Sequence, residues 1–173
     1  MTVTRLISPA DATELATLLT RNRAFLAPWE PVRSESFFTA EAQLTGIEDA
    51  LDRHAQGTTL PHVILDSGQL AGRITLNGIV RGPFLSCSVG YWVAQSANGR
   101  GLATAALREM VGIAFGELGL HRVQAETLAD NTGSQRVLER NGFYRIGMAP
   151  AYLRINGRWQ DHVLFQALNP AMS

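Results

Sequence analysis

The chain has 173 residues, of which 46% are hydrophobic, and this length and composition suit one buried core and hence a single domain over residues 1–173. Basic and acidic residues both number 15, so the formal net charge of zero gives no general attraction for nucleic acid or for a membrane surface. The single cysteine excludes an internal disulfide, and no segment approaches the roughly 20 apolar residues of a membrane span, so a cytoplasmic protein is expected.

The first elements predicted along the chain are a strand and two helices. Residues 3–7 read as the strand, and Ser8 followed by Pro9 is typical of a helix N-cap with proline in the first turn. A second helix is predicted to begin after an N-cap at Thr39 and to end before Gly57.

Residues 22–36 lie between these two helices and are rich in aromatic residues and proline. Their composition predicts an ordered but irregular loop rather than a helix or a disordered linker. Within it, Trp29 either covers the core or forms one wall of a substrate cleft, and the sequence leaves both roles open.

Three strands are predicted in the middle of the chain. Residues 60–65 and 70–76 form an antiparallel hairpin around a turn at Ser67 and Gly68, and residues 84–93 follow after a bend.

A glycine-bearing turn over residues 98–104 follows this third strand and opens a helix whose apolar residues recur at helical spacing until Gly119. Glycines allow close approach of the backbone, and the first turn of a helix offers unpaired N–H groups, so this order of elements suits phosphate oxygens. A tight connection without a ligand is the alternative.

The C-terminal third is predicted to contain a strand over 123–127, a helix that starts after Asn131 and ends at Gly142, and strands joined by a turn at Asn156 and Gly157. These last strands are expected over 143–148, 152–155 and 159–168. The order β-α-α-β-β-β-α-β-α-β-β predicts an α/β (α+β) fold of about seven mostly antiparallel strands and about four helices, with one parallel pair around the central helix.

Two motifs resemble the signatures of the GNAT N-acetyltransferases. Residues 98–103 are similar to the pyrophosphate loop Gln/Arg-x-x-Gly-x-Gly/Ala, with Asn98 replacing the first long side chain, and residues 131–143 are similar to Asn-x-x-Ser-x-x-Val/Leu-Leu-x-x-x-Gly-Phe. Further matches extend the likeness to the RimJ/RimL group, and most closely to its RimJ branch of ribosomal-protein-alanine N-acetyltransferases; they lie at 22–33, 80–82, 90–91, 121–122 and 152–162. The resemblance implies the GNAT fold with a splayed central parallel pair, acetyl-CoA as acyl donor, and no metal.

The resemblance also assigns the coenzyme-binding residues. It implies that the backbone of Tyr91, Trp92 and Val93 pairs with the pantetheine arm, and that the side chain of Asn131 reaches the pantetheine or acetyl end. A plain helix cap is the alternative role for Asn131. The pyrophosphate would be held by Gly99, Arg100, Gly101, Leu102, Ala103 and Thr104.

Acetyl transfer needs a donor for the oxyanion and a proton for the departing thiolate. A backbone N–H near Trp92 is the candidate oxyanion donor. Many relatives protonate the thiolate with a tyrosine, where this chain has Leu138, whereas the RimL branch is thought to use the serine that is Ser134 here. Ser134 is therefore either a catalytic acid or an exposed serine at a helix start.

The general base is left open because Ser88 stands where relatives often carry glutamate. Water, Glu126, Asp161 or His162 are the candidates, and an α-amino group with a pKa of about 8 does not demand a strong base. The residues that could line an acceptor cleft, or else be ordinary surface residues, are Trp29, Arg33, Arg81, Tyr152 and Arg154.

The sequence therefore predicts an acetyl-CoA-dependent N-acetyltransferase that acts on the N-terminal α-amine of a protein, a ribosomal protein first of all. An acyltransferase for a small-molecule amine is the first alternative, and the donor could carry a larger acyl group than acetyl. A non-catalytic acyl-CoA-binding module is the second, suggested by Ser88 and Leu138. Homodimers are common in the group, and no nucleic-acid or membrane partner is expected.

Overall fold

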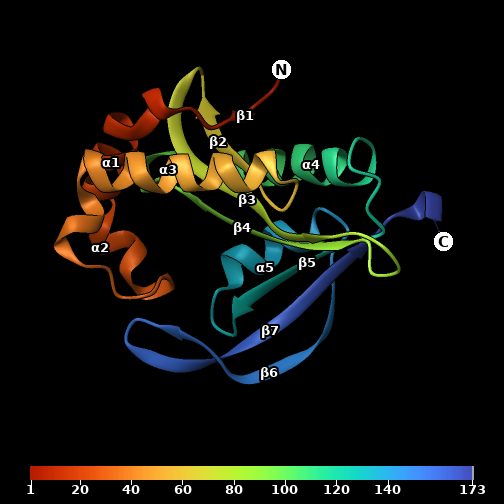
Figure 1. Cartoon of the computed structure of the whole chain (residues 1–173). Coiled ribbons are helices and arrows are strands. Elements are labelled where there is room, and N and C mark those ends of the chain that lie inside the picture. Colours follow the sequence, from red (N-terminus) through yellow and green to blue (C-terminus); the bar gives the residue numbers. More distant parts are fainter. Residues whose placement is uncertain (173) are drawn as a thin grey trace.

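A single seven-stranded sheet runs through the computed structural model, which describes residues 1–172 (Figure 1). Its strands lie in the order β1-β2-β3-β4-β5-β7-β6, and every neighbouring pair is antiparallel except β4 with β5. The strands are β1 (Thr4–Leu6), β2 (Leu60–Asp66), β3 (Gln69–Val80), β4 (Ser86–Val93), β5 (Arg122–Leu128), β6 (Tyr144–Ile155) and β7 (Arg158–Leu168). The predicted fold class and its one parallel pair are confirmed.

Helices cover both faces of this sheet. They are α1 (Ala12–Arg21), α2 (Arg23–Leu26), α3 (Ala40–Ala55), α4 (Leu102–Phe115) and α5 (Thr132–Glu139). Successive residues of β2 divide between the faces, since Val63 packs with α1 and α3 whereas Ile64 packs with α4. The sheet is thus the middle of three layers, with a buried cluster on each side. None of the helices in the described residues is both long and apolar enough to cross a membrane.

The stretch from 22 to 36 is more helical than its composition suggests. It contains α2 and a 3₁₀ turn over Ala27–Trp29, which makes five α-helices rather than about four. Pro28 lies in the first residues of that turn, where its missing N–H costs no hydrogen bond. The Asn22 amide fixes the start of the stretch, because its Nδ2 donates to the Leu18 carbonyl at 2.8 Å and its Oδ1 accepts from the Gln95 N–H at 2.8 Å. The stretch is thereby fastened to the segment that follows β4.

The parallel pairing of β4 with β5 is short. It joins only Ser86, Cys87 and Ser88 to the first three residues of β5. Beyond Ser88 the edge of β4 that faces β5 has no strand partner among the described residues, while β5 continues to pair with β7 as far as Leu128. The two strands therefore separate, as predicted, and leave a gap in the middle of the sheet.

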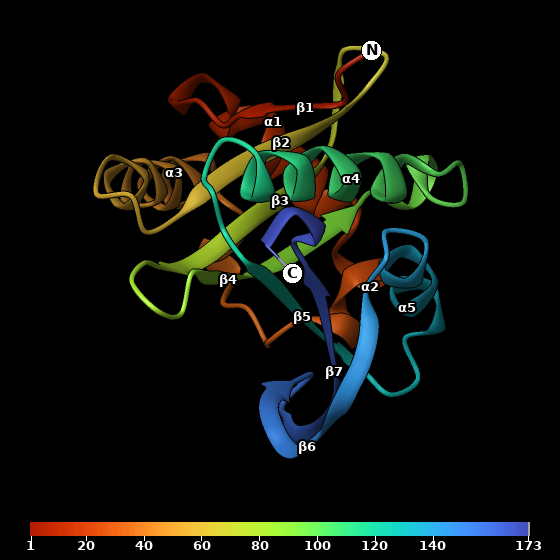
Figure 2. The same ribbon diagram turned by 90° about the vertical axis from the view of Figure 1, so that its right-hand side faces the viewer.

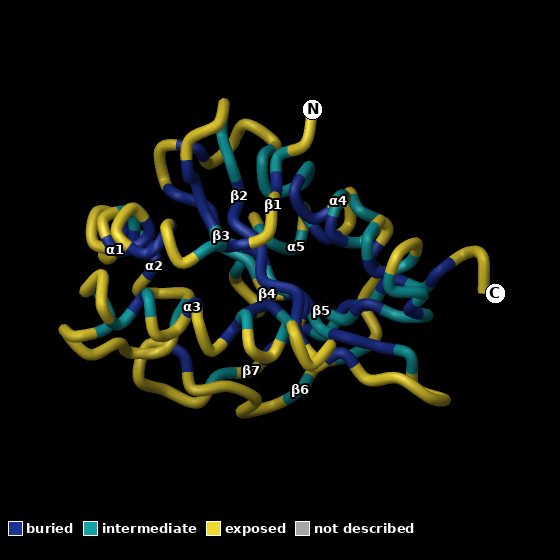
Figure 3. Tube along the Cα trace, turned by 45° about the horizontal axis from the view of Figure 1, so that its top comes forward, coloured by how far each residue is buried: buried dark blue, intermediate teal, exposed yellow. Residues whose placement is uncertain are grey.

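The β6–β7 hairpin lies at the opposite end of the molecule from the N-terminus (Figures 1 and 2). Most of β6 is exposed (Figure 3), and it is one strand with an irregularity between Ala149 and Leu153 rather than two strands. The predicted turn is present, with positive φ at Asn156 and Gly157. The Asn156 N–H donates to the Glu30 carbonyl at 2.8 Å, which ties the hairpin to the stretch after α2.

Candidate active site

The register of β4 decides which of its backbone groups face the gap. The Ala94 N–H donates to the Ala71 carbonyl on β3 at 2.7 Å, and the same register places Trp92 opposite Arg73. Because alternate residues of a strand direct their N–H groups to the same side, the Trp92 N–H also points toward β3. The N–H groups of Tyr91 and Val93 point into the gap instead. An oxyanion donor near Trp92 therefore stays a prediction, and the N–H groups available for it belong to the two neighbours of Trp92, Tyr91 and Val93.

A groove runs along the free edge of β4. Near the gap it is a cavity of about 380 Å³ between the end of β4, the α2 region with Trp29, and the start of α5. A second cavity of about 280 Å³ continues it to the glycine turn. The residues shared by both cavities are Val93, Asn98, Ala103, Gly133 and Val137. The groove thus connects the gap in the sheet to the start of α4.

The glycine turn presents free backbone donors to the groove. Gly99 and Gly101 have φ of 75° and 79°, a region that favours glycine, and Gly101 is the N-cap of α4. No side chain in the described chain caps this helix and its first turn carries no acidic residue, so the first N–H groups from Leu102 onward are available to an anion. The turn predicted to bind pyrophosphate has the geometry that such a ligand needs.

The arginines that line the groove near the glycine turn are not the one that the sequence predicted. The Arg100 guanidinium pairs with the carboxylate of Asp66, and Arg100 is not among the residues that line the groove. Two arginines that sequence reasoning missed line the glycine-turn end of the groove: Arg136 of α5 and Arg140, the C-cap of the same helix. In the sequence, these two arginines could have been found from their spacing, because residues four apart lie on the same face of a helix.

Asn131 is the N-cap of α5, which is the alternative role that the sequence left open for it, and it also lines the groove. Its Oδ1 accepts from the Ser134 N–H at 3.1 Å and so begins α5. This cap orients Ser134 toward β4, where its Oγ lies 2.9 Å from the hydroxyl of Tyr91. Burial raises the pKa of Tyr91 to about 12, although the hydrogen bond with Ser134 acts in the opposite direction. The Tyr91 hydroxyl is therefore protonated at neutral pH. Leu138 is fully buried in the core.

The gap itself is a cavity of about 250 Å³ that shares Tyr91, Trp92 and Ser134 with the groove. Two carboxylates line it, Glu30 from the stretch after α2 and Glu126 from β5. Burial raises the pKa of both groups, while Arg33 acts in the opposite direction on Glu30 and His162 does so on Glu126. One oxygen of Glu126 is buried without a hydrogen-bond partner in the described chain.

The three side chains considered for the base are not equally placed. Glu126 and His162 line the gap. Asp161 is exposed, and its Oδ1 accepts from the Ala151 N–H at 2.8 Å, which holds the irregular part of β6.

The residues expected to contact the acceptor also separate into two groups. Trp29 lines the gap. Tyr152 lies next to the gap, since its ring centroid is 5.6 Å from that of His162, which lines it. Arg33 lines a neighbouring cavity and stacks over Phe37. By contrast, the Arg81 guanidinium contacts the Leu118 carbonyl after α4, and Arg154 donates to the Gly157 carbonyl within its own hairpin at 3.4 Å. The structure does not bring Arg81 and Arg154 to the site.

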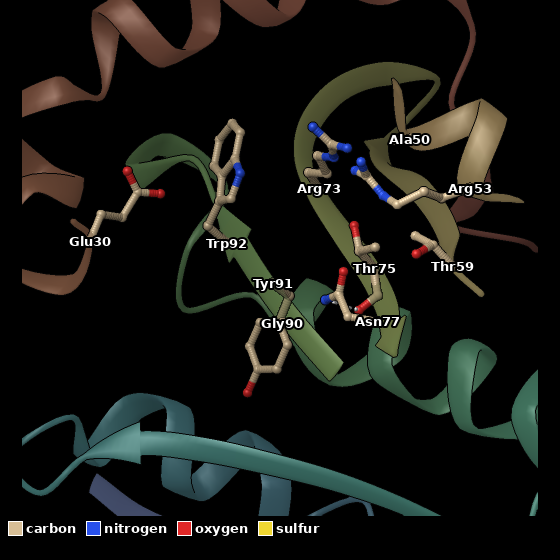
Figure 4. A pocket seen from close by; sticks show the side chains of 10 residues that line it. All are labelled: Glu30, Ala50, Arg53, Thr59, Arg73, Thr75, Asn77, Gly90, Tyr91 and Trp92. Carbon is tan, nitrogen blue, oxygen red and sulfur yellow. Dashed lines mark hydrogen bonds between the residues drawn. The ribbon is translucent and has the colours of Figure 1, made fainter. Parts of the chain in front are cut away.

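A further cavity of about 330 Å³ opens on the α3 side of β4 (Figure 4). It contains Arg53 of α3 and Arg73 of β3, which sequence reasoning missed because these residues are distant in the chain. A signal was present in β3, where polar residues alternate with buried Ile74 and Leu76. The polar residues of that alternation are Arg73, Thr75 and Asn77, and all three line the cavity.

Comparison with known proteins gives consistent matches over almost the whole chain. The family model described as acetyltransferase (GNAT) domain matches residues 2–144. Probable N-acetyltransferase YjcK of Bacillus subtilis is 34% identical over 168 residues, which are 96% of this chain and 93% of that protein. The ribosomal protein uS5-alanine N-acetyltransferase of Escherichia coli is 34% identical over 170 residues, which are 97% and 88% of the two chains. Among solved structures, Mycobacterium smegmatis RimJ in complex with CoA-disulfide is 30% identical, with a TM-score of 0.94 and coverage of 98% of this chain and 82% of that one.

Proposed function

The chain belongs to the GNAT acetyltransferases, and from that premise we propose that it transfers the acetyl group of acetyl-CoA to the N-terminal α-amine of a protein, a ribosomal protein first of all. One observation carries the proposal: the carboxylate-lined gap between β4 and β5 adjoins a groove with phosphate-binding geometry on one face and the cavity on the α3 side of β4 on the other. A thioester and an amine that enter from opposite faces meet there. The names of the similar proteins support the choice of acceptor.

Coenzyme binding is assigned to the groove. The free N–H groups at the start of α4 suit the pyrophosphate, and Arg136 and Arg140 supply positive charge beside it. The backbone groups of Tyr91 and Val93 that face the gap have no strand partner, so an extended pantetheine arm can pair with them as an added strand would. The N–H of either residue is then the donor for the oxyanion of the thioester carbonyl.

Proton transfer is assigned to the groups on the two sides of the gap. Glu126 accepts a proton from the incoming ammonium, directly or through water, because its raised pKa lies closer to that of an amine than the pKa of an ordinary carboxylate does. Ser134, which is hydrogen-bonded to Tyr91, gives its proton to the departing thiolate. The Tyr91 hydroxyl can then supply a new proton to Ser134.

The test is mass spectrometry of peptides that begin with Ala, Ser or Met after incubation with acetyl-CoA. Each peptide is paired with the same sequence blocked at its N-terminus, and a panel of small amines is run in parallel. The chain contains no lysine, so acetylation of the protein itself is limited to its own α-amine and a background signal is easily recognised. A gain of one acetyl group on the free peptides alone is expected. Modification of small amines alone would contradict the assigned acceptor.

A further inference from the structure

Two arginine side chains from different layers of the fold meet in the cavity on the α3 side of β4. Figure 4 shows the guanidinium groups of Arg53 and Arg73 facing one another, above Thr75. Arg53 projects from the last turns of α3, and Arg73 lies opposite Trp92 in the register of β3 with β4. The sheet and the helix thus place two cations side by side.

Neither guanidinium is neutralised by the protein. The ion pairs among residues 1–172 involve Arg5, Arg23 and Arg100, and neither the Arg53 nor the Arg73 guanidinium donates a hydrogen bond to a described residue. Glu30 lines the same cavity but lies on the other side of Trp92 (Figure 4).

This arrangement is electrostatically costly without a ligand. Burial lowers the pKa of Arg73, and the neighbouring Arg53 lowers it further. Arg73 is half-buried whereas Arg53 is exposed, so the repulsion between the two charges acts mainly on Arg73, and an anion between the guanidinium groups would relieve it. The planar fork of arginine suits a carboxylate in a bidentate arrangement.

The cavity also adjoins the place where the acceptor amine must lie. Gly90, Tyr91 and Trp92 line both this cavity and the gap between β4 and β5. Because Gly90 has no side chain, only the Asn77 amide lies near the position that a Cβ would take there, at 4.0 Å. An acceptor with its amine in the gap can therefore extend past Gly90 toward the arginines.

We propose that Arg53 and Arg73 form a carboxylate-binding subsite that selects acceptors carrying an acidic side chain close behind the reacting amine. The inference rests on the proposed function and specifies its substrate class. The amine occupies the gap, and the carboxylate of the same acceptor bridges the two guanidinium groups. A free amino acid with a second carboxylate offers the same chemistry, so free glutamate is tested as an acceptor beside the peptides.

The experiment compares peptides that begin with Ala and carry Glu at position 2, 3 or 4 with peptides that carry Gln at the same position. The subsite predicts that kcat/KM for one of the Glu peptides exceeds that of its Gln partner by about tenfold or more, the size of a charge-assisted hydrogen bond. Arg73→Gln and Arg53→Gln should reduce this preference to about twofold or less while turnover of the Gln peptides stays nearly unchanged. Arg108→Gln is the matched control, because Arg108 is exposed on α4 and lines none of the cavities.

A second measurement does not depend on catalysis. Titration calorimetry of the CoA-loaded protein with N-acetylated Glu and Gln peptides reports the affinity for the product. Tighter binding of the Glu product, lost in Arg73→Gln, supports the subsite even if transfer to peptides fails and the proposed function falls. Equal binding and equal turnover of Glu and Gln peptides would overturn the inference while leaving the proposed function intact. Transfer to free glutamate but to no peptide would contradict a peptide as the acceptor. It would support Arg53 and Arg73 as a binding site for the carboxylate of the acceptor.

Discussion

The paired hydroxyls of Tyr91 and Ser134 show how one side chain acquires its role from its neighbours. The Asn131 cap fixes the backbone of Ser134, and the Tyr91 hydroxyl then lies 2.9 Å from its Oγ. Removing the Ser134 hydroxyl should lower kcat by about 100-fold, the lower end of what a positioned acid contributes. Tyr91→Phe should have a smaller effect, since Ser134 keeps its own proton. Steady-state kinetics with acetyl-CoA and a peptide acceptor measure both effects.

Ser96→Ala is the control for this pair, because Ser96 is exposed and lines none of the cavities. Unchanged kcat in both Ser134→Ala and Tyr91→Phe would exclude the hydroxyl pair from proton transfer.

Glu126 predicts a distinctive pH dependence of the reaction. Burial raises its pKa, so the carboxylate loses its proton later than an ordinary glutamate as the pH rises, and kcat/KM should increase through that range. In Glu126→Gln, kcat/KM should fall about tenfold. The pH dependence that remains should follow the α-amine of the acceptor alone, with a pKa of about 8. Asp161→Asn, at an exposed carboxylate outside the gap, should leave the profile unchanged. An identical profile in Glu126→Gln would show that the base is elsewhere.

His62 should make the fold sensitive to acid. Burial lowers its pKa from 6.5 to about 4, helped by the nearby His54 and opposed by Glu109. As the pH falls below 6.5 the unfolded chain binds a proton at this position and the folded chain does not, so the free energy of unfolding declines until about pH 4. A loss of about 2 kcal/mol over this range is expected.

Urea unfolding of the wild type and of His62→Gln at several pH values tests this. Carboxylates such as Asp11, whose pKa is lowered by Arg5, contribute to both curves, so the difference between the two proteins isolates the histidine. The wild type should lose more stability than the variant between pH 6.5 and pH 4, and parallel curves would contradict the assignment.

Among the secondary-structure elements, the close approach of β3 to β4 supports the site most directly. A Cβ on Gly72 would lie 2.2 Å from the Trp92 carbonyl oxygen, which is backbone and cannot move aside without disturbing the ladder. Gly72→Ala should therefore destabilise the protein by about 2 kcal/mol or more and weaken coenzyme binding, because the end of β4 forms the groove.

Gly112→Ala is the matched control, since nothing lies within 4 Å of the added Cβ in the interior of α4. This change should stabilise the protein by about 0.5 to 1 kcal/mol. Thermal unfolding and CoA titration compare the two variants, and equal behaviour would show that β4 does not require the glycine.

The elements themselves were largely predictable, because each depends on local chemistry. Alternation of apolar residues marks the strands, Thr39 accepts from the Ala42 N–H as an N-cap does, and the Asn156–Gly157 turn joins β6 to β7. The helical turns between residues 22 and 36 were missed because a one-turn helix such as α2 is not stable by itself. It is held by tertiary contacts, among them the hydrogen bonds of Asn22 to residues on either side.

The site was predictable where it is continuous in the sequence. The glycine turn and the start of α5 are motifs of consecutive residues, and both lie on the groove. The direction of the Trp92 N–H was not predictable, because it depends on the register with β3. The meeting of Arg53 with Arg73 depends on the packing of α3 against the sheet, since the alternation in β3 indicates Arg73 but not its partner.

At the scale of the whole molecule, the proposed function uses the three layers to give the reactants separate entrances. The groove to which we assign the coenzyme lies between β4 and α5, while the cavity with the two arginines lies between β3, β4 and α3. The gap that joins them exists because β4 and β5 pair over only three residues. The β6–β7 hairpin, which is tied to the Glu30 carbonyl, also lines the gap through Leu153, Ile155 and His162.

A crystal structure with a bisubstrate analogue tests this account most directly. In the analogue, the sulfur of CoA is joined through an acetyl bridge to the α-amine of a peptide that begins with Ala and contains Glu. We predict that the bridge lies between β4 and β5, with its carbonyl oxygen within hydrogen-bond distance of the Tyr91 or Val93 N–H and its sulfur beside Ser134. The pyrophosphate should lie on the first turn of α4, and the peptide should leave on the α3 face. A bridge outside the gap, or a peptide that leaves along the coenzyme groove, would contradict the account.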